Sequence, residues 1–365
     1  MKNWTIRPFE TLPDWDAFVR DHRRGSIYHT AAMCRALQAT KDFQLYAKAA
    51  CDADNQIRAI VVSARISTMK KLGKYASRCV MFAEPLCCDS AEGSAALQRL
   101  LHDHDASMKR RALFTEIRPL FGDVESQRSR ESEAMMDAGY TRLGYNNYEL
   151  DLSASEEQLW RGIDTKTRGD IRRSERRGVT IRKVPLAEGL DVLYAHLQAS
   201  YGHSKIPLVD KSLFIAAARE LSSDQIETRI ADYQGVPIAS GCNLLFGDRI
   251  VYWYAGVVRT KGIAANSCLL WTAIQEGAAN GYKIFDFAGA GWVGEDYGPG
   301  KFKANFGGEL VEYGRYRRIY SKWSMWAAAA AYDWSRRWLS PKQVASEQLA
   351  SAVARAEETI GASKP

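Results

Sequence analysis

The apolar and polar positions of the chain repeat with two periods, one typical of strands and one typical of helices. In the first 150 residues, alternating or β-branched runs predict strands at 4–9, 44–50, 57–67, 78–82, 112–117 and 145–152. Apolar residues at helical spacing predict helices at about 14–24, 29–40, 91–110 and 131–138. Helices between the strands of a mixed sheet indicate one α/β domain of about 150 residues.

The same order returns in the second half. A helix is expected from Ser155 to about Arg177, because Glu156 and Glu157 lie in its first turn. Further helices are predicted at 189–201, 211–221 and 266–280, and strands at 179–184, 226–233, 236–245, 249–256, 283–287 and 309–313. A length of 365 residues fits two such domains. We expect them at 1–148 and 149–321, followed by a helical tail at 322–365.

Composition narrows the class of protein. With 46% hydrophobic and 25% charged residues, the chain has the composition of a globular protein. No apolar run has the length of a membrane-spanning helix, and the first residues lack the apolar core of a signal peptide. Seven scattered cysteines without a C-x-x-C pair indicate reduced thiols, and argue against a disulfide framework or zinc. We therefore expect a cytoplasmic protein without a metal.

The net charge of +7 is concentrated in one segment. Between Arg161 and Lys183 there are nine Lys or Arg residues and three Asp or Glu residues. Such a block favours phosphate ligands, for example nucleic acid, CoA, a nucleotide sugar or anionic lipid, and Arg168 and Arg172 are candidate contacts. A solvated helix face with intrahelical ion pairs, such as Glu175 with Arg172, is an equally good interpretation.

Glycines crowd both sides of two lysines in the stretch 282–313. Here a short strand is expected to enter a glycine-rich turn, and Lys301 and Lys303 follow among apolar neighbours. Lysines in this setting suggest an anionic ligand or developing negative charge. An ordinary surface loop with solvated lysines is the alternative.

Two separated blocks resemble the FemABX family. The sequence DFAG at 286–289 with KFKANFGGELVEY at 301–313 is similar to the C-terminal signature of that family. The block 150–184, with its Arg-x-x-Ile-Arg-Arg motif starting at Arg168, is similar to the family's entry to its second domain. The resemblance covers about residues 1–320. It implies two GNAT-like domains in tandem, an α/β fold of mixed sheets.

The resemblance also implies roles for individual residues. It implies that Lys303, with Lys301 in reserve, stabilises a tetrahedral intermediate of acyl transfer. It implies a basic residue for the acceptor's phosphates in the loop after Tyr201, where this chain has Lys205 instead of the family's common arginine. A lysine supplies the charge but not a bidentate fork. Asp286 is a candidate to orient Lys303 or to take a proton, and equally a candidate to cap the following turn.

A second motif points to another donor. Arg259-Thr-Lys-Gly262-Ile-Ala264 lies between a predicted strand and a predicted helix. It matches the short GNAT pattern in which backbone amides at a helix N-terminus bind the pyrophosphate of CoA. The shared fold also explains the turn as an inherited feature. Tyr252, in the preceding strand, is a further candidate for substrate binding.

These observations leave three functions open. The leading one is transfer of an aminoacyl group from aminoacyl-tRNA to an amine on a small or lipid-linked acceptor, with a peptidoglycan precursor as the family's usual acceptor. This reaction needs no tightly bound cofactor. The first alternative is an N-acyltransferase that uses acyl-CoA. The second is a non-catalytic binder of nucleic acid or anionic membrane, through the basic segment and the tryptophan-rich helix expected at 322–339.

Overall fold

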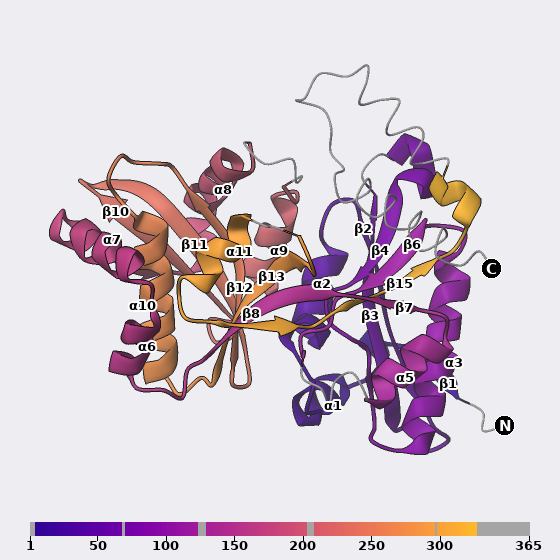
Figure 1. Cartoon of the computed structure of the whole chain (residues 1–365). Helices are drawn as coiled ribbons and strands as arrows, with labels where there is room; N and C mark the ends of the chain where they lie inside the picture. Colours follow the sequence, from indigo (N-terminus) through magenta and orange to yellow (C-terminus); the bar gives the residue numbers. More distant parts are fainter. Residues whose placement is uncertain (1–3, 68–69, 123–128, 203–207, 296–297, 327–365) are drawn as a thin grey trace.

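A computed structural model describes residues 4–67, 70–122, 129–202, 208–295 and 298–326, and every structural statement below concerns these residues. The chain forms two mixed sheets with helices packed on them (Figure 1). The predicted mixed α/β fold is therefore confirmed. Within the described part of the chain, no helix is both long enough and apolar enough to cross a membrane. Of the predicted tail, only 322–326 is described.

The first sheet contains one parallel pair, β4 with β6, among antiparallel neighbours. Its strand order is β1 (Thr5–Pro8), β2 (Phe43–Cys51), β3 (Ile57–Ser67), β4 (Ser77–Met81), β6 (Phe114–Ile117), β15 (Arg315–Ile319) and β7 (Thr141–Leu143), with β5 (Leu86–Cys87) paired to β3. The helices of this half are η1 (Phe9–Thr11), α1 (Trp15–Asp21), η2 (Ile27–His29), α2 (Ala31–Gln38), η3 (Lys70–Ala76), α3 (Ala91–Met108) and α5 (Arg130–Asp137).

The second sheet also has one parallel pair, β12 with β13. Its strand order is β14 (Glu309–Glu312), β8 (Tyr145–Asp151), β13 (Ile284–Trp292), β12 (Arg249–Val257), β11 (Val236–Phe246), β10 (Ile226–Tyr233) and β9 (Val179–Val184). The helices are α6 (Glu156–Gly162), α7 (Thr165–Arg176), α8 (Leu186–Tyr201), α9 (Ser212–Glu220), α10 (Ala265–Ala279) and α11 (Gly298–Ala304).

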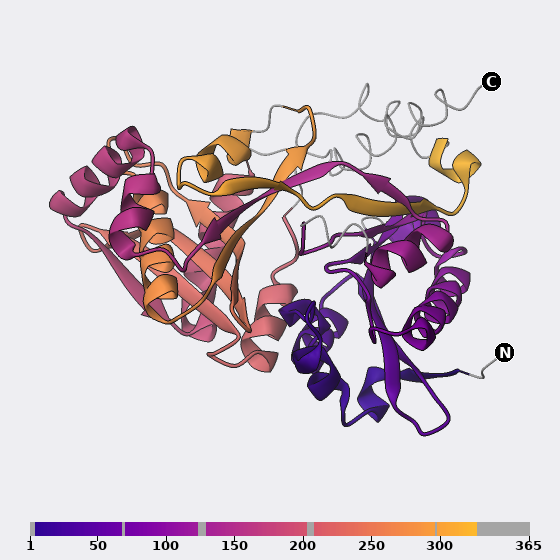
Figure 2. The same ribbon diagram turned by 60° about the horizontal axis from the view of Figure 1, so that its bottom comes forward.

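The chain crosses between the two sheets twice. After β7, β8 enters the second sheet, and after β14 the chain returns as β15, which lies between β6 and β7. Figure 2 shows β8 and the β14–β15 segment running together from one sheet to the other. The sequence did not indicate β15. The domain ranges 1–148 and 149–321 stay a prediction. β15 falls within the second range but pairs into the first sheet.

The single helix predicted from Ser155 to Arg177 is wrong, because the chain forms two helices there. Asp164 separates them: its carboxylate accepts hydrogen bonds from the backbone N–H groups of Lys166 (3.0 Å) and Thr167 (3.1 Å). This is N-cap geometry, which starts a new helix. The backbone N–H of Asp164 donates to the carbonyl of Asn305 (2.8 Å), so the break also fixes α7 against the segment after α11.

An apolar core joins the two halves. One buried cluster includes Met33 and Leu37 of α2 together with Leu213 and Phe214 of α9. At its edge Arg35 Nε lies 2.7 Å from Glu220 Oε2. Because protein interiors are closely packed, this shared core holds the two sheets in a fixed arrangement. Polar groups of the two halves that lie next to this core therefore keep fixed positions relative to each other.

Asp105 of α3 anchors the returning strand to the first sheet. Its carboxylate is 5% exposed and accepts hydrogen bonds from Tyr140 (2.8 Å), Tyr320 (2.8 Å) and Arg318 (2.7 Å). Burial alone would raise the pKa of Asp105, but the hydrogen bonds from His104 and the two tyrosines outweigh it and lower that pKa. The carboxylate is thus held charged. It links α3 to Tyr140 just before β7, to Arg318 of β15 and to Tyr320 just after β15.

We expect Asp105→Asn to lower the free energy of unfolding by about 1–3 kcal/mol, because a neutral amide replaces the charged, buried acceptor of hydrogen bonds from Tyr140, Tyr320 and Arg318. Urea denaturation measures this change. Asp103→Asn on the same helix is the matched control. Asp103 pairs with Lys48 (3.1 Å) and its side chain is 30% exposed, so the expected loss is below about 1 kcal/mol. Equal losses in the two variants would contradict the anchoring role.

Candidate active site

The two parallel strands of the second sheet separate at their C-terminal ends. β12 and β13 pair only from Arg249–Val251 to Ile284–Asp286, although the strands continue to Val257 and Trp292. α10 connects the end of β12 to the start of β13. Beyond the paired residues, the backbones of the two strands are no longer bonded to each other. Such an opening at the carboxyl ends of parallel strands is a usual place for a ligand.

A bulge distorts β13 at this opening. The register of β13 against β8 shifts between Asp286 and Gly289 and again before Gly291. Ala288 has a φ of +58°, a left-handed conformation that is uncommon for a residue with a side chain. Asp286 Oδ1 accepts a hydrogen bond from the Ala288 N–H (2.7 Å), which holds this conformation. The bulge leaves the carbonyls of Ala288 and Gly289 available outside the strand ladder.

Lys303 binds to these two carbonyls. Its Nζ donates to Ala288 O (3.1 Å) and to Gly289 O (2.7 Å). Burial lowers the pKa of Lys303 to about 8, while the negative charge of Asp286 opposes this shift. The residue lies on α11, where the sequence indicated a turn or loop, and β13 continues through the predicted glycine-rich turn. Both of these local predictions are wrong, but together the helix and the extended strand hold Lys303 at the opening.

Aromatic packing orients α11. Phe306 is fully buried just beyond the helix and packs on Phe287 of β13, with ring centroids 6.4 Å apart. Phe302 packs edge-on against Phe306 at 5.4 Å. The rings therefore fix one side of α11 on β13, and Lys303, the neighbour of Phe302, reaches the bulge. The spacing of Phe302, Lys303 and Phe306 in the sequence is the local cause of this geometry.

Asp286 is the centre of a buried polar cluster. It is fully buried, and Arg249 (3.4 Å) and the Tyr313 hydroxyl (3.3 Å) donate to its Oδ2. Glu149 shares both partners: Arg249 Nη1 donates to its Oε1 (2.6 Å), and so does the Tyr313 hydroxyl. Burial raises the pKa of Asp286, and the charge of Arg249 opposes this. A carboxylate enclosed in this way is suited to hold the bulge and bias Lys303 electrostatically, rather than to exchange protons with a substrate.

The first sheet contributes residues that sequence reasoning missed. Tyr28 stacks on Phe82, with ring centroids 5.7 Å apart, and Arg118 lies 6.0 Å from the same Phe82 ring. Burial and then the charge of Asp286 raise the pKa of the Tyr28 hydroxyl, so Tyr28 lies within electrostatic reach of Asp286 in the second sheet. These residues lie on the part of the first half that is nearest to Asp286. No local motif marks them, because each lies alone in the sequence.

Three further residues were predicted to bind substrate in this region, namely Lys301, Tyr252 and Lys205. Lys301 is exposed on α11. Tyr252 is partly buried, and its hydroxyl donates to Asn266 Oδ1 of α10 (3.3 Å). Lys205 lies outside the described residues. The roles of all three in substrate binding stay predictions.

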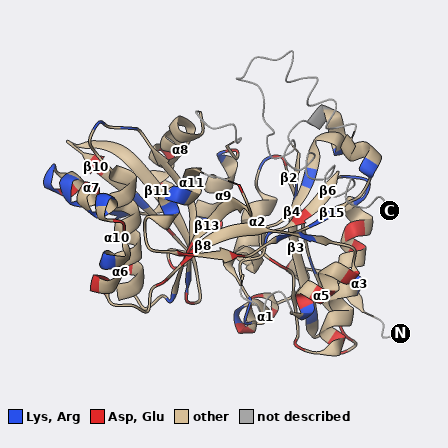
Figure 3. Ribbon diagram, in the orientation of Figure 1, with Lys and Arg blue, Asp and Glu red and all other residues tan. Residues whose placement is uncertain are grey.

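The basic helix α7 lies at the outer end of the second sheet, on the side away from the first sheet (Figure 3). Arg168 donates to the carbonyls of Arg161 (2.7 Å) and Ile163 (2.5 Å), so its guanidinium caps the end of α6. Arg172 is exposed and lies over the Trp160 ring at 5.1 Å. Within the described residues, neither arginine forms a hydrogen bond with Lys303 or Asp286. Their role as substrate contacts stays a prediction, and it concerns a surface separate from the bulge.

The turn before α10 carries the other predicted phosphate contacts. Arg259 is exposed, and Gly262 has a φ of +73°. The end of α7 already contacts this turn: Arg177 Nη1 donates to Gly262 O (2.9 Å), and Ser174 Oγ accepts from the Ala264 N–H (2.8 Å). One of the N–H groups that the turn would offer to a pyrophosphate is therefore occupied by a side chain.

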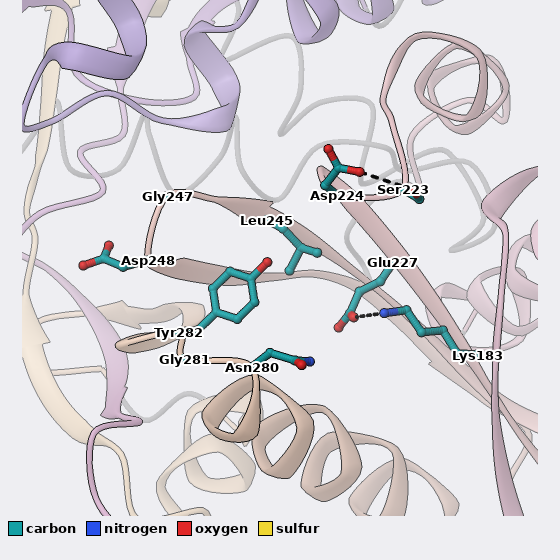
Figure 4. A pocket seen from close by; sticks show the side chains of 10 residues that line it. All are labelled: Lys183, Ser223, Asp224, Glu227, Leu245, Gly247, Asp248, Asn280, Gly281 and Tyr282. Carbon is teal, nitrogen blue, oxygen red and sulfur yellow. Dashed lines mark hydrogen bonds and ion pairs between the residues drawn. The ribbon is translucent and has the colours of Figure 1, made fainter.

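A cavity of about 390 Å³ lies at the opposite end of β12 (Figure 4). Asp224, Glu227 and Asp248 are among its lining residues, and Lys183 Nζ lies 3.1 Å from Glu227 Oε2. Carboxylates outnumber the lysine, so this lining is unfavourable for a phosphate. The cavity adjoins the start of β12 and is thus distinct from the opening that contains Lys303.

The electrostatic link between Asp286 and Lys303 is testable. Because the Asp286 charge raises the pKa of Lys303 against the effect of burial, Asp286→Asn is expected to lower that pKa further below about 8. NMR titration of the lysine Cε signals, assigned with Lys303→Met, measures this pKa. Glu149→Gln removes a carboxylate from the same buried cluster and is expected to leave the pKa of Lys303 nearly unchanged. An unchanged pKa in Asp286→Asn would contradict the coupling.

Residues 165–303 match the family model of an acetyltransferase (GNAT) domain. This segment contains α7, the opening between β12 and β13, and Lys303. No curated protein sequence matches the chain. The matched segment covers most of the second sheet and its helices, and it begins after the predicted start of the second domain.

Solved structures show the same fold at low sequence identity. The crystal structure of FemX superposes with a TM-score of 0.64 and 14% identity, covering 84% of this chain and 95% of that chain. The C-terminal domain of a proposed lysylphosphatidylglycerol synthetase from Agrobacterium fabrum has a TM-score of 0.54 and 14% identity, covering 88% and 93%.

A tandem GNAT protein from the clavulanic acid biosynthesis pathway has a TM-score of 0.52 and 11% identity, covering 87% of this chain and 99% of that chain. These likenesses extend over both sheets, whereas the family model covers the second alone. The chain thus has a tandem GNAT fold, and residues 165–303 in its second half match the GNAT acetyltransferase model.

Proposed function

We propose that the protein is an N-acyltransferase that forms an amide bond at the opening between β12 and β13, with Lys303 as the donor to the oxyanion. The observation that carries this proposal is the position of the Lys303 ammonium group, which two carbonyls of the β13 bulge hold at the open ends of the parallel strands. A fixed cation in a partly buried site stabilises negative charge that develops in the transition state.

The geometry fits the steps of acyl transfer. The amine nitrogen attacks the acyl carbonyl, the C–N bond forms, and the carbonyl oxygen takes up the negative charge of a tetrahedral intermediate. A lysine ammonium has three N–H donors, and Ala288 and Gly289 take two of them, which leaves one for that oxyanion. The bond from the carbonyl carbon to the leaving oxygen or sulfur then breaks, and the leaving group takes the proton that the amine loses.

Asp286 acts in this scheme as a positioning residue. It fixes the Ala288 N–H and thereby the carbonyls that hold Lys303. Its negative charge also favours the protonated form of Lys303, which is the form that can donate to an oxyanion. The turnover rate is therefore expected to depend on Asp286 through Lys303, without direct contact between Asp286 and the substrate.

Aminoacyl-tRNA is the donor that we favour. The motif residues at 286–289 and 301–313, through which the chain resembles the FemABX family, form the bulge, α11 and β14 around Lys303. For the acceptor, an amine on a small or lipid-linked molecule, such as a peptidoglycan precursor, follows from the same resemblance. The similar fold of a proposed lysylphosphatidylglycerol synthetase, whose name describes a lipid with a lysyl group, supports a lipid-linked acceptor.

An acyl-CoA donor is the second candidate, and the turn from Arg259 to Ala264 favours it. The turn precedes the N-terminus of the 15-residue helix α10 at the same open end of β12, where a pyrophosphate is electrostatically favoured. The tandem GNAT protein of similar fold from the clavulanic acid biosynthesis pathway is described in a form without AcCoA, which associates that protein with AcCoA. Against CoA, the Ala264 N–H is bonded to Ser174 Oγ.

A donor-binding experiment separates these functions. We expect filter binding to detect a complex with a mixed pool of aminoacyl-tRNA, and calorimetry to detect no micromolar binding of CoA or acetyl-CoA. Micromolar CoA binding that is lost in Arg259→Ala would overturn the tRNA donor in favour of the acyl-CoA enzyme. Salt-dependent nucleic-acid binding without turnover with either donor would favour the non-catalytic binder.

We expect Lys303→Met to lower kcat by about 10²–10³-fold with a smaller change in KM, because the residue is proposed to act in the transition state. Steady-state kinetics with the donor identified above measures both constants, and the melting temperature shows whether the variant folds. Lys301→Met on the same helix is the matched comparison. A loss of kcat in Lys301→Met with normal kcat in Lys303→Met would reassign the role to Lys301.

The wild-type rate is also expected to fall as pH rises through about 8. The reason is that Lys303, with its lowered pKa, loses the proton that it donates to the oxyanion. The pH profile of kcat measures this dependence. A rate that increases through the same range would contradict the proposed role of the protonated Lys303.

A further inference from the structure

Three chain segments meet at one end of the first sheet. The Leu113 N–H donates to Ser77 O (2.9 Å), and the Tyr320 N–H donates to Leu113 O (3.0 Å). η3 ends directly before Ser77, and residues 109–111 lead from α3 into Leu113. A helical turn at 322–326 begins shortly after Tyr320. Figure 1 shows this turn, in yellow, at the same end of the first sheet. The hydrogen bonds therefore bring η3, the end of α3 and the helical turn close together.

The most exposed aromatic side chains of the protein lie at this end. Trp323 is 81% exposed, Trp326 58% and Tyr75 of η3 47%, and no other Trp, Tyr or Phe among the described residues is as exposed. Trp323 and Trp326, three residues apart, share one side of the helical turn, with ring centroids 6.2 Å apart. Met325, on the other side of the turn, is buried. We call Trp323, Trp326, Tyr75 and the half-exposed Leu72 of η3 the aromatic patch.

Basic residues accompany the aromatic patch. Lys322 is exposed on the helical turn, and residues 109–111, a Lys-Arg-Arg sequence, are exposed at the end of α3. Lys74 Nζ lies 5.1 Å from the centroid of the Tyr75 ring. The segments that meet here hold seven Lys or Arg residues and no Asp or Glu, over 70–77, 109–113 and 320–326. This end of the sheet therefore combines exposed rings with an excess of positive charge.

Rings and cations in this combination match the surface of an anionic bilayer. Trp and Tyr side chains favour the level of the lipid headgroups, because each has an apolar body and one polar group. Lys and Arg beside them are attracted by negatively charged headgroups. A nucleic acid would also match the charge. Leu72 and the two tryptophans, which pack on each other, favour instead a partner with hydrocarbon beneath its charges.

We propose that the aromatic patch and the basic residues around it rest on an anionic lipid bilayer, with the rings at the depth of the headgroups. The contact is peripheral, since no helix of the described residues is long and apolar enough to cross a membrane. Lys303 lies on α11, which packs on the second sheet, so membrane contact and chemistry use separate surfaces. That the bilayer presents the acceptor amine rests on the proposed function, whereas binding to the bilayer does not.

Sedimentation of the full chain with vesicles tests the rings. Binding is expected to vesicles made of equal parts phosphatidylcholine and phosphatidylglycerol. Trp323→Ala combined with Trp326→Ala is expected to weaken it at least about 10-fold, because the bilayer no longer buries the apolar rings. Val236→Ala is the matched control, since Val236 is also 58% exposed but lies at the start of β11 in the second sheet. Equal binding by the wild type and the tryptophan variant would overturn the proposal.

A second pair of variants tests the charges. Arg110→Gln combined with Arg111→Gln is expected to weaken binding to the mixed vesicles at least about 10-fold, because two cations are lost from the membrane surface. Arg172→Gln combined with Arg176→Gln is the matched control, because it removes the same charge from exposed positions on α7. A loss of binding in the α7 variant alone would overturn the proposal. Equally strong binding to vesicles of phosphatidylcholine alone would do the same.

Fluorescence locates the rings at the bilayer. Vesicles with brominated acyl chains are expected to quench the tryptophan fluorescence of the wild type. This quenching is expected to be lost in Trp323→Phe combined with Trp326→Phe, whose melting temperature should stay near that of the wild type because both rings are exposed. Quenching that persists in this variant would overturn the proposal. Binding of aminoacyl-tRNA that is lost in the variant, with vesicle binding unchanged, would assign the aromatic patch to nucleic acid and also overturn it.

Activity separates the membrane contact from the proposed function. Vesicle binding that depends on Trp323, in a protein without acyl transfer, would leave the membrane contact in place and overturn the proposed function. Acyl transfer to a soluble amine, in a protein that binds no anionic vesicles, would overturn the membrane contact alone.

Discussion

The hydrogen bond from the Ala288 N–H to the Asp286 carboxylate is the interaction on which the candidate active site depends. It holds one residue of β13 in a left-handed conformation, and this conformation turns two consecutive carbonyls out of the ladder. Hydrogen bonds to those two carbonyls hold the Lys303 ammonium group in position. The carboxylate itself stays buried because Arg249 and Tyr313 complete its hydrogen bonds. The left-handed Ala288, the ion pair of Asp286 with Arg249 and the Lys303 ammonium group are thus connected by hydrogen bonds.

The two sheets carry buried polar clusters of opposite charge. In the second sheet, Glu149 and Asp286 share one arginine, so negative charge prevails beside Lys303. In the first sheet, Glu116 is shared by several arginines, so positive charge prevails. The apolar core between α2 and α9 keeps these clusters at a fixed separation.

The sequence predicted most of the long strands and helices, because hydrophobic periodicity is a local property, but it missed the short strands β5 and β7, the helix α11 and the strand β15. It also singled out Lys303 and Asp286, which share one short segment with recognisable motif residues. It missed what depends on distant contacts: Tyr28 of η2, Arg118 just after β6 and Arg315 of β15 come near one another only through the folding of the first sheet. The break at Asp164 had a local signal, an N-cap residue before a helix. The basic residues on both sides obscured that signal.

The insertion of β15 between β6 and β7 has a consequence for the order of folding. When β7 leaves the ribosome, its partner strand has not yet been synthesised, and β6 also lacks one neighbour. The first sheet can close only after residues 315–319 emerge, so the two halves cannot mature one after the other as independent domains. Until then two strand edges are exposed to pairing with other chains. The nascent chain must therefore keep these two edges from pairing with other chains until residues 315–319 are available.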